Sequence, residues 1–487
     1  MRSTFRPALV WLAALLTAWA FSALQALTGT EVPLIGIGVL CVLACLWLLP
    51  KRTARARMWL WLLLGAAAGL VFILMEPHAF SRHDLAHYEV GQNGHLGYIA
   101  YIAKKGTLPL ANETEQLNIY YNPPLYHLLQ AAFMRLNLLL GFEEGAALEN
   151  LQAITYAFAM LAPMTAVQIA GELGADEKGK SLCALVAAFA PIGLILGATL
   201  TSDSMVCALL LLTIWRMLIW IRTREMRHIV WMGLCLGCAM ATKLNAALMI
   251  PPMALVFIVL FFREKENRKR LFGQYAAFLG VSVPEAVAWP LYHLLACGMP
   301  LSYVPLPSES QNVSSYSLWQ RFGIPGNQVL HSLFHTKDRA VTHNVWMETL
   351  KTGIFDEVVL FDEGTPIWYI SYLWMVLFAV LLVVMTILFI RMMLKRAPGQ
   401  RLPGIFLLTY GVIIFAYYLK FCVDYPYTCT YNFRYIEPLM FLGCIALSWG
   451  RGHLKRSSWL VTLCGCFAGL CVLVWGMYFF GSSLYMG

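Results

Sequence analysis

Charged side chains are scarce in this sequence. Asp, Glu, Lys and Arg make up 13% of the 487 residues, whereas hydrophobic residues make up 60%. Soluble globular domains average roughly 25% charged residues, so this composition excludes a soluble protein. Many apolar runs reach the ~20 residues that an α-helix needs to cross a bilayer. Because lipid cannot hydrogen-bond an open backbone, the spans must be helices, and the sequence predicts an all-α polytopic membrane protein.

Motifs for binding nucleotides are also missing. We find no P-loop and no dinucleotide fingerprint, no low-complexity linker and no soluble domain. We also find no internal repeat of the kind that is common in transporters. Most of the 13 cysteines lie in apolar runs, where cysteine acts as a small hydrophobic residue. Cys422 and Cys429 share one predicted outer loop, and the sequence leaves a disulfide between them open.

Thirteen apolar runs are predicted to span the membrane: 8–28, 33–50, 58–76, 151–171, 181–200, 204–221, 228–242, 245–262, 272–296, 366–391, 403–421, 435–450 and 458–480. The run 124–141 is also long enough to cross. However, His127, Gln130 and Asn137 fall on one face of its predicted helix, at spacings of three and seven residues.

The placement of basic residues decides whether 124–141 crosses. Basic clusters occur at Lys51–Arg57, Arg222–Arg227, Arg263–Arg270, Arg391–Arg401 and Arg451–Arg456. If 124–141 lies in the interface, all five clusters fall on the cytoplasmic side; if it crosses, the last four fall outside. Cytoplasmic loops carry the excess of Lys and Arg, so we predict an interfacial or re-entrant helix. The N-terminus is then cytoplasmic and the C-terminus outside, in a cell (plasma or inner) membrane.

Four regions follow from this topology. Residues 1–57 form a transmembrane hairpin with a basic cytoplasmic loop. Residues 58–296 form a membrane module that includes a large outer loop, 77–150. Residues 297–365 form a second large extracytoplasmic loop, and residues 366–487 supply the C-terminal transmembrane helices.

Two aspartates are candidates for chemistry at the outer face. Asp84 lies in the polar outer loop, between His83 and His87. A carboxylate near apolar surface can act as a general base, although a solvated helix-capping acid would look the same. Asp203 lies in the turn between two spans, where it would also suit an N-cap.

Two cations are predicted at the same face. Lys243 interrupts an apolar stretch, which is costly unless it pairs with an anion or snorkels to the interface. Arg434 begins a later span, beside Tyr435. Either side chain can bind a phosphate, Lys243 as a point charge and Arg434 through two donors. Together the acids and cations suit an anionic, lipid-embedded substrate.

Several short motifs, in order, resemble the GT-C glycosyltransferases of family 39, the protein O-mannosyltransferases and the lipid A aminoarabinose transferase. The motifs are His83-Asp84, Gly94-His95-Leu96, Gly106-Thr107-Leu108-Pro109, Pro123-Pro124-Leu125, the turn with Asp203, Thr242-Lys243 and Arg434-Tyr435 followed by Pro438. The resemblance covers roughly residues 58–450. Many relatives have a second acid directly after the first, whereas Leu85 follows Asp84 here, which leaves a role for a divalent metal open.

The resemblance implies an inverting membrane transferase with a GT-C type bundle of about 13 transmembrane helices. A sugar would pass from a polyprenyl-phosphate donor to an acceptor hydroxyl or phosphate at the outer face. Asp84 would be the general base, acting either without an adjacent carboxylate or with Glu89 or Asp203 as a partner acid. Lys243 and Arg434 would stabilise the departing phosphate. Contacts to sugar or acceptor would come from His83, His87, Glu89, His95, Tyr121 and Tyr435. A lipid-linked polysaccharide polymerase or ligase, and a lipid or solute transporter, remain the alternatives.

Overall fold

The chain folds almost entirely into helices. The computed structural model describes residues 5–78, 87–109, 118–299, 307, 309–326, 343–357, 364–395 and 401–481. Within these ranges the only β pairing is an isolated antiparallel bridge between Asn312 and Tyr427. The prediction of an all-α membrane fold is therefore confirmed.

The helices before the second large loop are α1 (Pro7–Thr28), α2 (Glu31–Leu48), α3 (Ala54–Met75), α4 (His95–Lys105), α6 (Leu125–Leu139), α7 (Glu144–Asn150), α8 (Gln152–Glu172), α9 (Glu177–Ala188), α10 (Pro191–Ala198), α11 (Asp203–Thr223), α12 (Met226–Met240), α13 (Ile250–Arg263) and α14 (Arg268–Ala296). Short 3₁₀ segments are η1 (Leu49–Lys51), η2 (Asn118–Tyr121) and η3 (Leu244–Met249), and η4 (Lys265–Asn267) joins α13 to α14.

The later elements are η5 (Glu309–Gln311), α15 (Leu318–Phe322), α17 (Val345–Phe355), α18 (Pro366–Leu394), α19 (Arg401–Asp424), η8 (Thr428–Thr430), η9 (Phe433–Ile436), α20 (Glu437–His453) and α21 (Ser458–Phe480). The buried core lies where α8, α9, α11 and α20 pack together, and α20 is buried along most of its length.

The number of membrane spans differs from the predicted thirteen. In the described part of the chain, nine segments are long and apolar enough to cross a bilayer, or ten if one bent pair counts as a span. The predicted spans 228–242, 272–296 and 435–450 correspond to α12, α14 and α20, which are not among the nine. The protein is a multi-pass membrane protein, and the count of thirteen stays a prediction.

The predicted span 181–200 is not one straight helix. It divides into α9 and α10, whose axes differ by 49°. Pro191 begins α10, and Ala190 before it is extended, with φ −65° and ψ 112°. Proline lacks an N–H and pushes the preceding residue out of the helical region, so the break is a local consequence of the sequence.

The helix predicted to lie in the interface is present as α6. It has 15 residues and is not among the candidate spans. His127, Gln130 and Asn137, the three residues predicted to share one face, are all fully buried. That face therefore packs on protein: Gln130 bonds to Tyr126, and the Asn137 side chain accepts from Trp19 and from Asn150.

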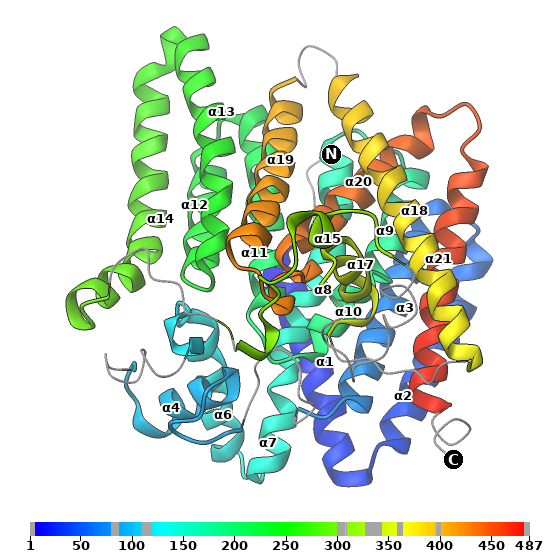
Figure 1. Cartoon of the computed structure of the whole chain (residues 1–487). Helices are drawn as coiled ribbons and strands as arrows, with labels where there is room; N and C mark the ends of the chain where they lie inside the picture. The colour runs from blue at the N-terminus through cyan, green and yellow to red at the C-terminus, as the bar shows by residue number, and fades with distance from the viewer. Residues whose placement is uncertain are drawn as a thin grey trace.

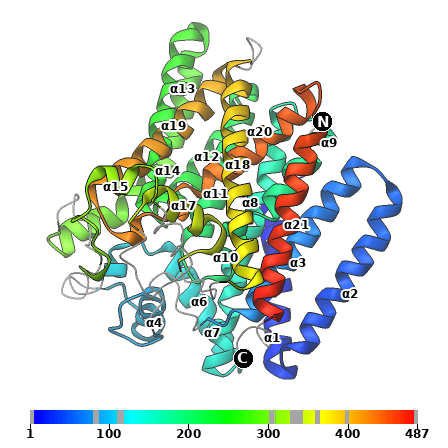
Figure 2. The ribbon, with the colours of Figure 1, turned by 45° about the vertical axis from the view of Figure 1, so that its right-hand side comes forward.

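The two ends of the bundle have different characters. The start of α1 lies at the end that carries the α13–α14 and α20–α21 turns, whereas α4, α6, α7 and the last residues of α21 lie at the opposite end (Figures 1 and 2). The basic α11–α12 turn joins the first end, because Arg224 forms an ion pair with Glu264 at 2.8 Å. The short helices α4, α6 and α7 thus lie at one end of the bundle, and the basic α11–α12, α13–α14 and α20–α21 turns lie at the other.

Candidate functional site

Asp203 and Lys243 form an ion pair although 40 residues separate them. Asp203 is the first residue of α11, so it lies inside the helix and Ser202 takes the N-cap position. Lys243 follows α12 in an extended conformation, just before η3. Its Nζ donates to Asp203 Oδ1 at 2.5 Å, and the two side chains are 19% and 6% exposed. The pairing accounts for a cation in this apolar stretch.

Beside the ion pair lies a small cavity, which we call the aromatic pocket. It is lined by Tyr121, Asn122, Pro123, Lys243, Leu244, Asn245, Leu248, Tyr417, Tyr418, Phe421 and Tyr435, and its volume is about 140 Å³. The Lys243 Nζ lies 5.2 Å from the ring centroid of Tyr435, within reach of a cation–π interaction. The pocket thus combines a cation with aromatic walls.

Arg434 adds a second cation next to the pocket. Its Nη2 donates to the Tyr435 hydroxyl at 3.3 Å, and its guanidinium lies 5.2 Å from the same ring. Asn432 caps η9 by accepting from the Arg434 backbone N–H at 2.9 Å. Lys243 and Arg434 therefore lie on the same tyrosine, an arrangement that can bind an anion with an organic tail.

Residues of α17 and Glu357 after it form hydrogen bonds with the segment that carries Arg434. Thr352 of α17 accepts a hydrogen bond from the backbone N–H of Phe433 at 2.9 Å. Asn432 Nδ2 donates to Glu357 Oε1 at 3.0 Å. Burial raises the pKa of Glu348 on the same helix, against the opposing charge of Lys351 at 3.2 Å. Polar residues of α17 and the segment after it thus fix where the Arg434 backbone lies.

The segment from η2 to the start of α6 contacts the aromatic pocket. The Leu125 backbone N–H donates to the Ala241 carbonyl at 3.1 Å, which ties the start of α6 to the segment before Lys243. Trp289 Nε1 donates to the Tyr121 carbonyl at 2.8 Å. Tyr121, predicted to contact substrate, is thereby held at the pocket wall.

His95 lies in a buried layer instead of the pocket wall. Its Nδ1 is 2.9 Å from His127 Nε2, and the two rings are stacked with centroids 5.1 Å apart. Burial, and secondarily the His95 ring, hold the pKa of His127 well below its usual range. This stack joins α4 to α6 and supports the loop that carries Tyr121.

The remaining predicted site residues are not brought to the pocket by the described structure. His83 and Asp84 lie outside the described residues, and His87 and Glu89 are exposed. Among the residues that are described, no group of three His, Cys, Asp or Glu side chains is placed to hold a metal ion. Cys422 and Cys429, between which a disulfide was left open, are both free thiols.

Sequence reasoning missed the contribution of α19. Tyr417, Tyr418 and Phe421 form one wall of the aromatic pocket. Their spacing puts Tyr417 and Phe421 on one face of the helix, which is a readable signal. However, aromatic residues near a membrane interface are common without any ligand.

Sequence reasoning also gave no role to Glu437, which lies near the ion pair. Glu437 is 2% exposed, and the charges of Asp203 and Lys243 act on it.

Comparison with known proteins agrees with the motifs. Residues 121–289 match the family model described as dolichyl-phosphate-mannose-protein mannosyltransferase. The predicted resemblance to family 39 glycosyltransferases is confirmed. The matched segment contains Tyr121, Asp203 and Lys243 and ends before Arg434. No curated protein matches the chain.

Two solved structures match the chain in the comparison of folds. They are ArnT from Cupriavidus metallidurans in the apo state, with 15% sequence identity, and the same protein bound to undecaprenyl phosphate, with 17%. Each has a TM-score of 0.46, and the match covers 83% of this chain and 62% of ArnT. The chain thus spans less than two thirds of the length of these proteins.

Proposed function

We propose that this protein is an inverting membrane glycosyltransferase that takes its sugar from a polyprenyl-phosphate carrier. The acceptor is a hydroxyl or phosphate group at the extracytoplasmic face of the cell membrane. The observation that carries the proposal is the aromatic pocket with Lys243 in its wall, inside the segment that matches the mannosyltransferase family.

The chemistry assigns different tasks to the charged residues. Asp84 takes the proton from an acceptor hydroxyl, and the acceptor oxygen attacks the anomeric carbon from the side opposite the phosphate. The bond between the anomeric carbon and the phosphate oxygen breaks, and the lipid phosphate leaves with the electron pair. Lys243 and Arg434 stabilise the negative charge that develops on this phosphate.

Asp203 takes the role of a positioning residue. Its carboxylate accepts a hydrogen bond from Lys243 at 2.5 Å. An acid engaged in this way holds the ammonium group in place at the pocket wall. The aromatic side chains Tyr121, Tyr417 and Tyr435 supply flat apolar surface for the sugar or for the first isoprene units.

Binding of undecaprenyl phosphate to the purified full-length protein tests the donor site. Lys243→Ala should weaken binding by about tenfold or more, because a charge-assisted contact contributes roughly 1.5–3 kcal/mol. Lys180→Ala is the matched control, since Lys180 forms an ion pair with Glu177 at 2.9 Å on α9. Equal affinity of both variants and the wild type would contradict the donor site.

The products distinguish transfer from the alternatives. Mass analysis of envelope glycolipids and glycoproteins, from cells with and without the gene, should show an added sugar that depends on Lys243. Long lipid-linked glycans in place of a single added sugar would favour a polymerase or ligase. Solute movement across vesicles without sugar transfer would favour a transporter.

A further inference from the structure

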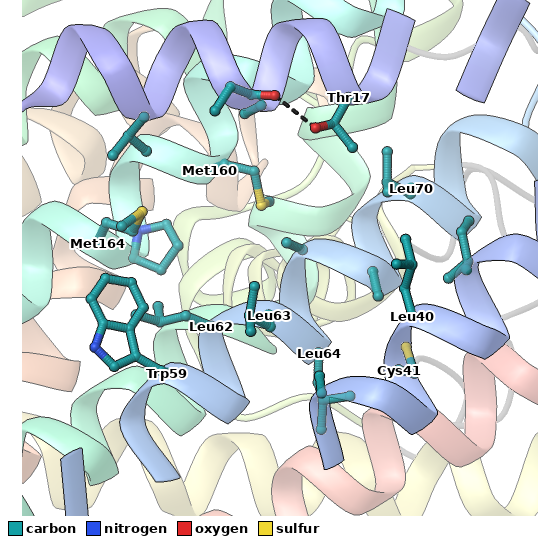
Figure 3. Close-up of a pocket in the computed structure, with 18 of the residues that line it drawn as sticks. Thr17, Leu40, Cys41, Trp59, Leu62, Leu63, Leu64, Leu70, Met160 and Met164 are labelled. Carbon is teal, nitrogen blue, oxygen red and sulfur yellow. Dashed lines mark hydrogen bonds between the residues drawn. The ribbon is translucent and has the colours of Figure 1, made fainter. Parts of the chain in front are cut away.

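A second cavity, larger than the aromatic pocket, lies between α1, α2, α3 and α8, and neither Asp203 nor Lys243 lines it. We call it the hairpin groove. Its volume is about 650 Å³, within the range of small-molecule sites. Figure 3 shows leucine, methionine and tryptophan side chains along its walls. Its two hydroxyl groups are already engaged: Thr17 donates to the Ala13 carbonyl at 2.7 Å and Tyr156 to the Ala66 carbonyl at 2.9 Å. The walls therefore suit a hydrocarbon chain and not a sugar.

A basic cavity of about 370 Å³ continues the groove at the α2–α3 turn. Both cavities are lined by Trp47, Trp59 and Leu63, so they adjoin. The basic cavity also includes Lys51 and Arg55. The Lys51 Nζ lies 3.6 Å from the Trp47 ring centroid, which fixes the ammonium above the indole. In the part of the chain that the structure describes, neither cation takes part in an ion pair.

The order of surfaces along α2 matches the order of groups in one phospholipid. The groove follows α2 from Ile37 to Trp47. Ten residues of helix rise about 15 Å, which is half of the ~30 Å hydrocarbon core and therefore the depth of one leaflet. Trp47 and Trp59 follow, as residues that favour the level of the headgroups. Lys51 and Arg55 come last, where a lipid phosphate would lie.

We propose that the hairpin groove binds one anionic phospholipid, with an acyl chain between α1, α2 and α3 and its phosphate at Lys51 and Arg55. The occupied groove would hold the α1–α2 hairpin against α3. This site is separate from the aromatic pocket, so it does not depend on the sugar chemistry proposed above. Charge complementarity at the basic cavity is what favours an anionic lipid over a neutral one.

Native mass spectrometry of the full-length protein tests the site. The probes are phosphatidylglycerol and phosphatidylcholine with identical palmitoyl and oleoyl chains. We expect phosphatidylglycerol to bind on the order of tenfold more tightly, since each of two basic residues contributes a few-fold near a headgroup. Lys51→Gln with Arg55→Gln should remove this preference. Lys455→Gln with Arg456→Gln, an equal loss of charge at the α20–α21 turn, should keep it.

A groove-filling variant tests the acyl chain. Ala44 lines the groove, and Ala44→Trp should weaken the binding of both lipids. Because Lys51 and Arg55 are unchanged in this variant, it should still prefer phosphatidylglycerol to phosphatidylcholine. The residues changed in the two charge variants are exposed, so these variants should fold. They test the proposal even if Ala44→Trp does not fold. Equal binding of the two lipids to the wild type, or equal loss in both charge pairs, would overturn the proposal. Displacement of phosphatidylglycerol by undecaprenyl phosphate would also overturn it, because the groove would then belong to the sugar donor.

Discussion

Neutralising either partner of the Asp203–Lys243 pair should destabilise the protein, and a lipid phosphate should reverse the effect of Asp203→Asn only. Two unit charges 2.5 Å apart attract by about 7 kcal/mol at an effective dielectric constant of 20. Loss of hydration offsets much of this, so breaking a buried pair costs roughly 3–5 kcal/mol. Lys243 is 19% exposed, which favours the lower figure, about 3 kcal/mol, for Asp203→Asn.

A double-mutant cycle separates the pair from other effects. Lys243→Met leaves the Asp203 carboxylate buried without its cation, so it should destabilise by a similar amount. The double variant Asp203→Asn with Lys243→Met leaves no buried charge at either position, and neutral replacements of buried pairs are often tolerated. We expect the double variant to be more stable than either single variant, with a coupling energy of about 3 kcal/mol.

The assay is the apparent melting temperature in detergent, with and without undecaprenyl phosphate. The lipid phosphate should stabilise Asp203→Asn more than the wild type, because it replaces the lost countercharge of Lys243. It should stabilise the double variant less than the wild type, because only Arg434 remains to bind the phosphate. If the two single effects simply add, the pair is not coupled. If the lipid stabilises Lys243→Met as much as the wild type, Lys243 is not a phosphate ligand.

Three further outcomes are expected. Asp84→Asn should lower transfer by roughly 10²–10⁴-fold with unchanged expression, and near wild-type transfer would remove Asp84 as the base. The depressed pKa of His127 means that only the unfolded chain binds its proton, so stability should fall below pH ~6.5 by up to about 1.4 kcal/mol per pH unit. His127→Phe should show a smaller drop in melting temperature between pH 7.5 and 5, and an equal drop would assign the acid sensitivity elsewhere. Asn137→Leu should lower the free energy of unfolding by about 2–4 kcal/mol, since it removes the acceptor of the buried Asn150 amide and of the half-buried Trp19 indole N–H. Leu136→Ala on the exposed face should lower it by under about 0.5 kcal/mol, and equal melting temperatures of the two variants would contradict this.

Much of the fold could be predicted from the sequence, because a run of about 20 apolar residues is enough to indicate a membrane-spanning helix. Apolar runs predicted the long helices. The polar stripe on 124–141 predicted a helix that does not cross the membrane; the helix is present as α6, and its place relative to the membrane stays a prediction. The span 181–200 was predicted as one helix, although Pro191 by itself indicates the break between α9 and α10. Short helices such as α12, with 15 residues, were harder, because hydropathy does not set where a helix ends.

The site was predicted as a set of residues but not as a geometry. The sequence predicted Asp203, Lys243 and Arg434 at one face and called for an anion beside Lys243, but it did not identify that anion as Asp203. Pairing across 40 residues depends on how α11 and α12 pack, and that is a tertiary property. The pocket wall from α19 was missed for the same reason, since Tyr417 and Phe421 are equally consistent with contact to lipid.

The pairing also bears on which acid can act as the base. A general base needs a lone pair within reach of the acceptor hydroxyl. Asp203 is 6% exposed, and one of its carboxylate oxygens accepts a hydrogen bond from the Lys243 ammonium, which limits the access of an acceptor hydroxyl to its lone pairs. The same contact holds the lysine ammonium at the wall of the aromatic pocket. Asp203 is therefore better suited to positioning Lys243 than to accepting a proton, which leaves the proton transfer to Asp84 in the proposed reaction.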